Sequence, residues 1–397
     1  MHLRAPDAPS ARDLQQAVGE SLDRRLLRDH PRAVAVALSG GGDSLALLLA
    51  AADWAKAGGR RLLVLTVDHG LRPESAGWTG ICAATAQRLG LDFRALGWAG
   101  EKPATGLPAA ARAARHALLA DAARAAGARV IMMGHTADDL METRLMREAG
   151  STTPDPREWT PSPAWPEGRG VFLLRPMLDI RRADIRDWLR VRGETWIDDP
   201  ANEDTAYARP RARQALDRDA IPAAAGAIPT AAALALACRA DEAAGFEIAR
   251  DELRAAAPAA VTRFLSAACL CAAGTTRPPA RAQVKRLAGR LEGHELFVAS
   301  LAGARVEADL GHVRFRREAG EAARGGLAPL RLVADETGVW DGRYQVSAEQ
   351  AVEIRAARGS TAPLALRSDG ETEPLRSMAL TRDRLLAACG AIESETP

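Results

Sequence analysis

Short apolar runs alternate with longer alanine- and leucine-rich segments over the first third of the chain, and this alternation strongly limits its possible folds. Each run is bounded by glycine, proline or charged residues, which predicts buried strands, whereas the longer segments predict helices. The predicted strands are residues 33–38, 61–67, 92–96 and 129–133, and the predicted helices are residues 44–56, 74–89 and 108–126. Strands that alternate with helices form a doubly wound α/β fold with a mostly parallel sheet.

Polar motifs directly follow three of these predicted strands. They are SGGGDS at residues 39–44, DHGLR at residues 68–72 and GHTADD at residues 134–139. Ligands of doubly wound sheets bind outside the carboxyl ends of the strands. We therefore expect the three motifs to form one site.

The first motif is typical of a turn that holds a phosphate. It consists of Ser39, Gly40, Gly41, Gly42, Asp43 and Ser44. Glycines allow the backbone to approach a bulky anion, and N–H groups at a helix start point toward it. No lysine follows the glycines, so the motif is not a Walker A loop. A carboxylate is repelled by phosphates unless a cation lies between them, so Asp43 predicts Mg²⁺. A glycine-rich turn without a ligand is the alternative.

The third motif opens a predicted helix with a stripe of ionisable residues. His135, Asp138, Asp139 and Glu142 stand at i, i+3, i+4 and i+7, which places them on one helix face. Three carboxylates and an imidazole repel one another unless Mg²⁺, an ammonium group or a protonated histidine offsets them. The alternative is a solvated face whose acids are favoured by the helix dipole.

These motifs resemble those of a known enzyme family. SGGGDS resembles the SGGxDS motif of the N-type ATP pyrophosphatases, and V-D-H-G-L-R at residues 67–72 resembles V-[DN]-H-G-L-R of the tRNA(Ile)-lysidine synthetases. A-R-A-A-R-H at residues 111–116 resembles A-R-x-x-R-Y of that family, with His116 in place of tyrosine. H-T-A-D-D-L-M-E-T at residues 135–143 resembles H-x-x-D-D-Q-x-E-T, with Leu140 in place of glutamine.

A fourth stretch, residues 173–216, extends the resemblance to about half of the chain. It resembles the family pattern R-P-L-L … W-x-x-D-x-S-N … R-N-x-x-R, with Ala201 in place of serine and Pro210 in place of asparagine. The resemblance implies a fold similar to the adenine nucleotide alpha hydrolases. It also implies ATP as a substrate together with Mg²⁺.

The resemblance further implies a two-step reaction on an isoleucine tRNA with a CAU anticodon. ATP adenylates the C2 carbonyl oxygen of the wobble cytidine, and free L-lysine then attacks C2, expels AMP and leaves lysidine. Three other functions stay open. They are a tRNA thiolation enzyme of the same superfamily, a small-molecule adenylating or amidating enzyme, and a nucleotide-binding module without activity. Thiolation enzymes often carry C-x-x-C clusters, and this chain has none.

The expected site residues follow from the motifs and the resemblance together. ATP-binding residues are expected at Ser39, Gly40, Gly41, Gly42, Asp43, Ser44, Asp68, His69 and Gly134. Catalytic residues are expected at Asp43, His135, Asp138, Asp139 and Glu142, with Asp43 also as the metal ligand. Contacts with tRNA or phosphate are expected at Arg112, Arg115, Arg175, Arg209, Arg213, Arg281, Lys285 and Arg286.

The remaining sequence predicts extensions to the catalytic domain, which we expect at residues 1–218. Residues 219–320 are expected to be helical, at residues 220–273, and then β-containing, and to contact tRNA, because residues 277–317 hold nine Lys or Arg against four acids. A solvated face on a scaffold domain is the alternative. Residues 321–397 form a small segment to which we assign no role.

Composition bears on location and partners. The N-terminus has no apolar segment typical of a signal peptide, and no run of about 18 apolar residues occurs, so we expect a cytoplasmic protein without a membrane partner. Five scattered cysteines suit a reducing compartment. A net charge of +2 creates no general attraction to nucleic acid. A homodimer is compatible with the sequence.

Overall fold

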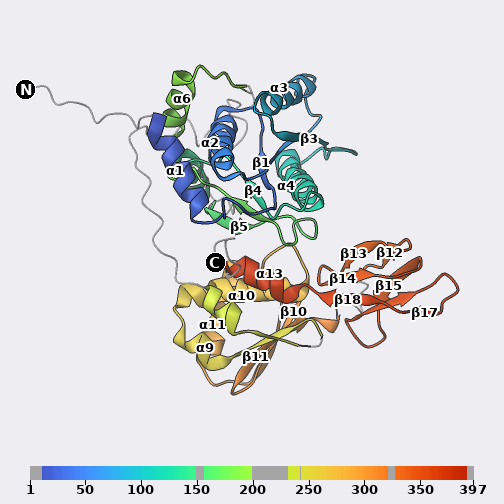
Figure 1. The fold of residues 1–397 in the computed structure, drawn as a ribbon. Helices are drawn as coiled ribbons and strands as arrows, with labels where there is room; N and C mark the ends of the chain where they lie inside the picture. The colour runs from blue at the N-terminus through green and yellow to red at the C-terminus, as the bar shows by residue number, and fades with distance from the viewer. Residues whose placement is uncertain (1–10, 149–155, 199–230, 242, 321–326, 391–397) are drawn as a thin grey trace, which may run out of the picture. The chain divides into compact units, whose positions relative to one another are not determined.

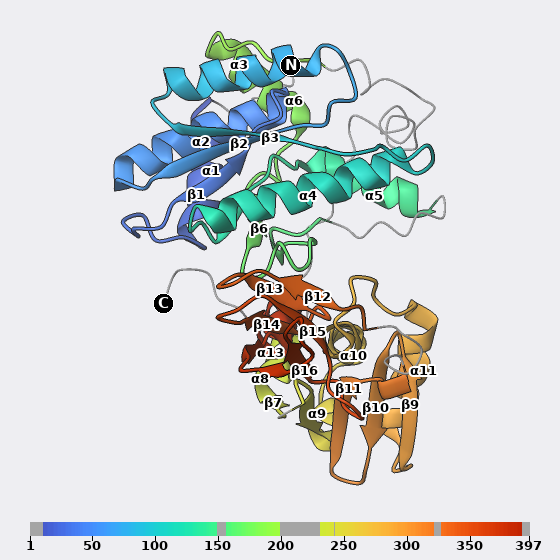
Figure 2. The same ribbon diagram turned by 90° about the vertical axis from the view of Figure 1, so that its right-hand side faces the viewer.

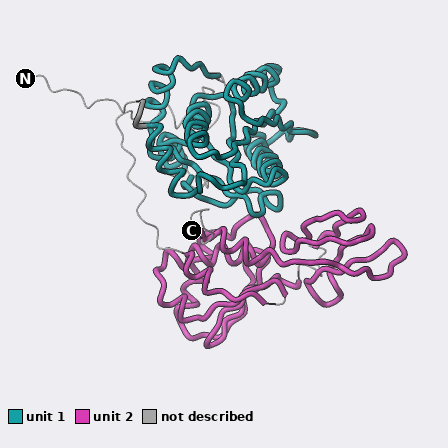
Figure 3. The backbone as a smooth tube through the Cα atoms, viewed as in Figure 1, with its two compact units in different colours: residues 1–226, 393–397 teal, residues 227–392 magenta. Residues whose placement is uncertain are grey.

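The structure is a computed structural model and describes residues 11–148, 156–198, 231–241, 243–320 and 327–390. The chain divides into two compact units (Figure 3). The first comprises residues 1–226 with 393–397, and the second comprises residues 227–392. Among the described residues, no helix is both long enough and apolar enough to cross a membrane.

The first unit alternates strands and helices (Figure 1). Its elements are α1 (Ala11–Asp23), β1 (Val34–Ala37), α2 (Gly42–Gly58), β2 (Leu62–Asp68), α3 (Ser75–Arg88), β3 (Asp92–Gly97), α4 (Leu107–Ala125), β4 (Val130–Met132), α5 (Ala137–Glu148), β5 (Trp159–Pro161), β6 (Phe172–Leu174) and α6 (Arg182–Val191). The strands and helices predicted between residues 33 and 133 are confirmed, with ends that differ by at most two residues.

Six strands form one sheet in the order β3-β2-β1-β4-β6-β5, in which only β5 pairs in an antiparallel direction. Val34 pairs with Leu62 on one side of β1, and Ala35 pairs with Ile131 on the other. The chain thus runs from β1 outward to β3 and then returns to the opposite side of β1. Ligands of such sheets bind where the strand order reverses, which here lies at the carboxyl ends of β1 and β4.

The central strand β1 is buried on both faces. Val34 and Val36 belong to a core with residues of α1, α2, α3 and α6, whereas Ala35 belongs to a separate core with residues of α4. Figure 2 shows α2 and α3 on one side of the strands and α4 on the other. A strand covered on both faces has to be apolar throughout, which explains its uninterrupted Val-Ala pattern. The predicted doubly wound fold is confirmed.

The second unit combines helices with short antiparallel strands. Its elements are α8 (Ala231–Ala237), β7 (Arg239–Ala240), β8 (Phe246–Ala249), α9 (Arg250–Ala255), α10 (Pro258–Ala273), α11 (Arg281–Glu292), β9 (Phe297–Leu301), β10 (Ala304–Ala308), β11 (His312–Arg317), β12 (Leu330–Leu332), β13 (Thr337–Trp340), β14 (Tyr344–Ser347), β15 (Val352–Ala356), β16 (Pro363–Leu366), β17 (Thr372–Glu373), β18 (Arg376–Ala379) and α13 (Thr381–Cys389).

A five-stranded antiparallel sheet, in the order β7-β8-β11-β10-β9, shares a core with α8, α10, α11 and α13. The β-structure expected between residues 273 and 320 is present as β9, β10 and β11. The expectation that residues 220–273 are helical throughout is wrong, because β7 and β8 lie within them. In β8, Phe246 and Ile248 are buried while Glu247 between them is half-buried, and this alternation of four residues is too short to stand out in an alanine-rich stretch.

Two smaller sheets follow in the second unit, one with the order β12-β15-β16-β17 and one with the order β13-β14-β18. Trp340 and Tyr344 lie in the core that these sheets share. Helix α13 then packs against α10, and Leu385 and Cys389 of α13 belong to the same core as the five-stranded sheet.

Candidate active site

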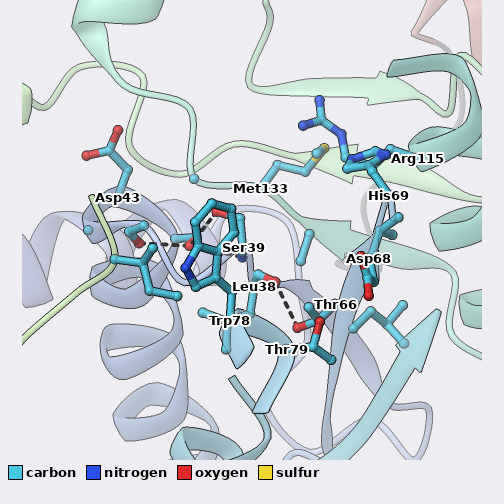
Figure 4. A pocket seen from close by; sticks show the side chains of 18 of the residues that line it. Leu38, Ser39, Asp43, Thr66, Asp68, His69, Trp78, Thr79, Arg115 and Met133 are labelled. Carbon is cyan, nitrogen blue, oxygen red and sulfur yellow. Dashed lines mark hydrogen bonds between the residues drawn. The ribbon is translucent and has the colours of Figure 1, made fainter. Parts of the chain in front are cut away.

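A cavity of about 560 Å³ lies at the carboxyl ends of β1, β2 and β4, which is within the usual range for a small-molecule site. Figure 4 shows Asp43 on one side of this cavity and His69 and Arg115 on the other, with Trp78 and Ser39 between them. Among the predicted site residues, the cavity is lined by Ser39, Gly41, Gly42, Asp43, Ser44, Asp68, His69, Arg115, Gly134, His135 and Asp139.

The loop after β1 is shaped by Gly40 and by the segment that follows α6. Gly40 has a φ of +84°, and a Cβ there would lie 2.4 Å from Cδ1 of Ile197. The carbonyl of Gly40 accepts a hydrogen bond from the N–H of Ile197 at 2.9 Å. A side chain at this position would therefore be strained and would also push away the segment that covers the loop.

The beginning of α2 is held by serines within the loop. The hydroxyl of Ser44 donates to the carbonyl of Gly41 at 2.9 Å and accepts from the N–H of Ser39 at 3.2 Å. The N-cap residue Gly41 makes no side-chain cap, and Gly42 and Asp43 form the start of the helix. Gly42, Asp43 and Ser44 of the first turn of α2 line the cavity, and Gly41 provides no side-chain cap for the helix start, which is the arrangement that binds anions.

Gly134 brings the end of β4 against the start of α2. A Cβ on Gly134 would lie 2.9 Å from the carbonyl carbon and oxygen of Asp43. This is closer than Cβ contacts occur, so a larger residue would separate the two motifs. The glycine therefore places His135 and Asp139 in the same cavity as Asp43.

Helix α5 begins at Ala137, so His135 precedes the helix and is not part of a helical stripe, which corrects the predicted arrangement. The start is defined by a reciprocal cap. The N–H of Thr136 donates to Oδ2 of Asp139 at 2.8 Å, and the N–H of Asp139 donates to Oγ1 of Thr136 at 3.4 Å. This is a capping box, so one oxygen of Asp139 is committed to the helix end.

Arg182, at the start of α6, joins the acidic residues of the site. Its Nε donates to Oδ2 of Asp43 at 3.0 Å, its Nη1 to Oε1 of Glu142 at 2.9 Å, and its Nη2 to Oδ1 of Asp139 at 3.4 Å. Glu142 is fully buried and does not line the cavity. Sequence reasoning expected Mg²⁺, an amine or a histidine to offset these carboxylates, and it missed this guanidinium.

The electrostatics of this cluster follow from burial and charge. Burial raises the pKa of Asp43 and outweighs the opposing attraction of Arg182. Burial alone would lower the pKa of Arg182, but the carboxylates of Asp43, Asp139 and Glu142 raise it above its ordinary value. Arg182 is therefore charged at every accessible pH.

Asp138 does not line the cavity, and its carboxylate connects helix α5 to helix α6. Its Oδ2 accepts the N–H of Arg182 at 2.7 Å and Nε of Arg181 at 3.3 Å. The residue thus ties the start of α6 to the first turn of α5.

The opposite side of the cavity carries Asp68 and His69. The N–H of Gly70 donates to Asp68 at 2.8 Å and lowers the pKa of its carboxyl. Burial and the nearby charge of Arg115 lower the pKa of His69, whose ring meets Trp98 edge-on at 6.0 Å. The imidazole is therefore neutral near pH 7.

The predicted tRNA or phosphate contacts lie in different settings. Arg115 lines the cavity, Arg112 is exposed on α4, and Arg175 is buried and donates to a carbonyl and a hydroxyl of its own unit. Arg209 and Arg213 lie outside the described residues.

In the second unit, Arg281, Lys285 and Arg286 are exposed on α11. Among the residues that the structure describes, no group of three His, Cys, Asp or Glu side chains is arranged to hold a metal ion.

Comparisons with known proteins agree with this site. The family model described as a PP-loop domain matches residues 7–220, more than half of the chain. A tRNA(Ile)-lysidine synthase of Caulobacter vibrioides is 49% identical over 349 residues, which are 87% of this chain and 82% of that protein. One of Brucella anthropi is 35% identical over 83% of this chain and 77% of that protein. One of Bradyrhizobium sp. is 47% identical over 45% of this chain and 50% of that protein. The chain belongs to the tRNA(Ile)-lysidine synthase family of PP-loop proteins.

Proposed function

We propose that this protein uses ATP to ligate L-lysine to C2 of the wobble cytidine in an isoleucine tRNA with a CAU anticodon, which gives lysidine. The observation that carries the proposal is one cavity lined by both the SGGGDS loop and the GHTADD motif, in a chain whose relatives are named tRNA(Ile)-lysidine synthase. The cavity supplies an anion-binding helix start beside ionisable groups, which are the parts that adenylyl transfer needs.

In the first step, O2 of the cytidine attacks the α-phosphorus of ATP, an O–P bond forms, and pyrophosphate leaves. The N–H groups at the start of α2 and the hydroxyl of Ser39 are proposed to bind the phosphates, while the hydroxyl of Ser44 holds the loop through its bond to Gly41. Mg²⁺, when bound, would neutralise phosphate charge. Asp43 fits its ligand needs, since Mg²⁺ is held by one or two carboxylates together with substrate phosphates.

In the second step, an amine of lysine attacks C2, a C–N bond forms, the C2–O bond breaks, and AMP leaves with the oxygen. The attacking amine must lose a proton in this step. His69 lines the cavity and is neutral near pH 7, so it is a candidate acceptor for that proton. His135 is proposed to flank the nucleoside from the end of β4.

The cysteines favour this reaction over the thiolation alternative. All five are buried free thiols, Cys82, Cys238, Cys269, Cys271 and Cys389. Burial raises the pKa of the Cys82 thiol and raises the pKa of each of the other four to about 12. A thiol of this kind does not carry or deliver sulfur, because the thiolate is the reactive form.

The basic face of α11 supports a tRNA contact by the second unit. Arg281, Lys285 and Arg286 are exposed, and within the described ranges none of them forms an ion pair with an acid. Unpaired cations on one helix face suit RNA phosphates. Because ATP and tRNA are the proposed substrates, we propose that the protein acts in the cytoplasm.

Product release with defined substrates tests the proposal. The protein is incubated with ATP, L-lysine and unmodified isoleucine tRNA, and each component is omitted in turn. AMP formation that requires both lysine and tRNA supports the proposal. AMP formation driven by ammonia or by a sulfur donor would support an alternative function instead.

A further inference from the structure

We propose that Arg182 binds the polyphosphate of ATP, and that Asp138, Asp139 and Glu142 position this arginine instead of binding lysine. The inference rests on the proposed function and reassigns the acidic residues within it. The carboxylates, which the sequence suggests would be offset by Mg²⁺ or an ammonium group, would then hold a guanidinium that binds phosphate.

The side chain of Arg182 is held from behind by buried carboxylates. Glu142 accepts Nη1 at 2.9 Å and is fully buried, and Asp139 accepts Nη2 at 3.4 Å and is 8% exposed. A buried carboxylate requires a charge partner, since burial without one is strongly unfavourable. Arg182 already gives both acids a charge partner, so a lysine ammonium would have to share these acids with it or displace it.

The main chain of Arg182 is fixed by the same helix. Asp138 accepts the N–H of Arg182 at 2.7 Å and Nε of the preceding residue, Arg181, at 3.3 Å. Arg182 is the first residue of α6, so both its backbone and its guanidinium are anchored on α5. A group fixed in this way loses little conformational entropy when it binds a substrate.

Arg182 also has donors left for a ligand. A guanidinium carries five N–H donors, and the bonds to Asp43, Asp139 and Glu142 use three of them. The other two have no acceptor among the described residues. Arg182 lines the cavity with its side chain 12% exposed, so an interaction with phosphate is weakly screened.

The bond to Asp43 places these donors beside the anion-binding helix start. Asp43 is the second residue of α2, and Nε of Arg182 lies 3.0 Å from its carboxylate. A phosphate held by the first N–H groups of α2 therefore lies next to Arg182. Arginine suits this task because its planar fork matches two phosphate oxygens.

Three variants test the inference, with ATP affinity and tRNA-dependent ATP–pyrophosphate exchange as readouts. Exchange without lysine reports the first step alone. In Arg182→Gln we expect ATP affinity to fall about tenfold and exchange to fall about 10²-fold, with the KM for lysine unchanged. Asp139→Asn and Glu142→Gln should lower exchange in the same way, again without a change in the KM for lysine. If they instead raise that KM with normal exchange, they bind lysine and the inference is wrong.

A double variant tests whether Glu142 acts by positioning Arg182 or acts independently of it. It also limits the destabilisation that a single unpaired carboxylate would cause. Arg182→Gln combined with Glu142→Gln removes both members of one buried ion pair, so one buried carboxylate fewer loses its charge partner than in Arg182→Gln alone. If Glu142 acts through Arg182, the double variant exchanges no more slowly than Arg182→Gln alone. If the losses of exchange in the two single variants multiply in the double variant, the inference is wrong.

A control and the wild type complete the design. Arg190→Gln changes an arginine of the same helix that is exposed and pairs with Asp187, and it should retain normal affinity and exchange. Wild-type protein that binds ATP but forms no lysidine would contradict the proposed function. Wild-type protein that forms lysidine, together with normal ATP affinity and exchange in Arg182→Gln, would contradict only the inference about Arg182.

Discussion

Asp43 is the residue on which the proposed chemistry depends most. It occupies the first turn of α2, lines the cavity and is bonded to Arg182. Burial raises the pKa of its carboxyl group, so ionising Asp43 costs more free energy in the folded protein than in water. Such a cost is typical of a functional residue, and the carboxylate is the group in this cavity best placed for a cation beside phosphate.

Replacing Asp43 by Asn should nearly abolish adenylation while the fold is retained. The amide keeps the shape but loses the charge, and we expect exchange to fall by about 10²-fold or more. The readout is tRNA-dependent ATP–pyrophosphate exchange, with circular dichroism to verify folding. Asp53→Asn is the control, since Asp53 lies on the same helix and pairs with Arg192. Near-normal turnover in Asp43→Asn would show that the Asp43 carboxylate has no essential role in the mechanism.

His116 predicts how stability depends on pH. Burial, and then the charges of Arg115, Arg112 and Arg175, lower its pKa from 6.5 to about 2. Below pH 6.5 His116 takes up a proton in the unfolded chain but not in the folded protein. The free energy of unfolding therefore has its full value above pH 6.5 and decreases as the pH falls. Between pH 7.5 and pH 5 this one group costs about 2 kcal/mol.

His116→Tyr should therefore remove this part of the acid sensitivity. The free energy of unfolding is measured by urea titration at pH 7.5 and pH 5 for both proteins. We expect the wild type to lose about 2 kcal/mol more than the variant over this interval. An equal loss in both proteins would show that His116 is not the responsible group.

Residues that act within one motif could be predicted from the sequence, whereas those that act between motifs could not. The loop and GHTADD residues were found because each motif is contiguous. Arg182 is 139 residues from Asp43 and 40 from Glu142, and only the fold brings them together. Trp78 also lines the cavity and carries no signal of its own in the sequence.

At the scale of elements, helix ends were less predictable than helices. Thr136 and Asp139 form the S/T-x-x-D pattern of a capping box, which would have placed the start of α5 after His135. The short strands β7 and β8 had no such marker. Strand β7 pairs with β8, and β8 pairs with β11, so part of the information that makes them strands lies outside residues 220–273.

Arg250, the first residue of α9, connects several elements of the second unit. Its side chain is fully buried and donates to the carbonyls of Arg290, Leu291, Glu295 and Asp309 at 2.8–3.2 Å. Two of these acceptors lie in the last turn of α11, where carbonyls lack partners within the helix. Arg250 thus caps α11 and binds it to the neighbouring loops.

Arg250→Met should destabilise the second unit by about 3 kcal/mol, because four buried carbonyls lose their donor. Calorimetry should show a melting transition lowered by about 10 °C. Arg331→Met is the control, since the side chain of Arg331 is 86% exposed and its ion pair with Glu353 contributes little. Equal effects in both variants would contradict a capping role for Arg250.

At the scale of the whole molecule, the catalytic unit was predicted more completely than the second unit. Alternating strands and helices determine both the sheet and the edge at which a ligand binds. In the second unit, the antiparallel sheets join strands of two to six residues that are separated along the chain. Strand pairing of this kind leaves little local pattern, so only β9, β10 and β11 could be predicted.

The basic face of α11 carries the proposed tRNA contact of the second unit. Changing Arg281, Lys285 and Arg286 together to alanine should weaken tRNA binding and flatten its salt dependence. The slope of log K against log salt is negative, and each lost phosphate contact reduces its magnitude by about 0.9 or less. Binding is measured by filter retention over a series of salt concentrations.

A second triple variant serves as the matched control. Arg331, Arg355 and Arg376 are also exposed in the second unit, but each pairs with a glutamate. Changing them to alanine should leave both affinity and salt slope unchanged. An unchanged slope in the α11 variant would contradict the proposed tRNA contact and would support a solvated face on a scaffold domain instead.

The mass of unmodified isoleucine tRNA after incubation with the protein, ATP and L-lysine tests the account most directly. We predict a mass increase of one lysine residue at the wobble cytidine, with one AMP released for each modified tRNA. Isotope-labelled lysine should shift that mass by its label. An unchanged tRNA, or one that gains sulfur or ammonia instead, would contradict the transfer of AMP to an RNA base for attack by lysine.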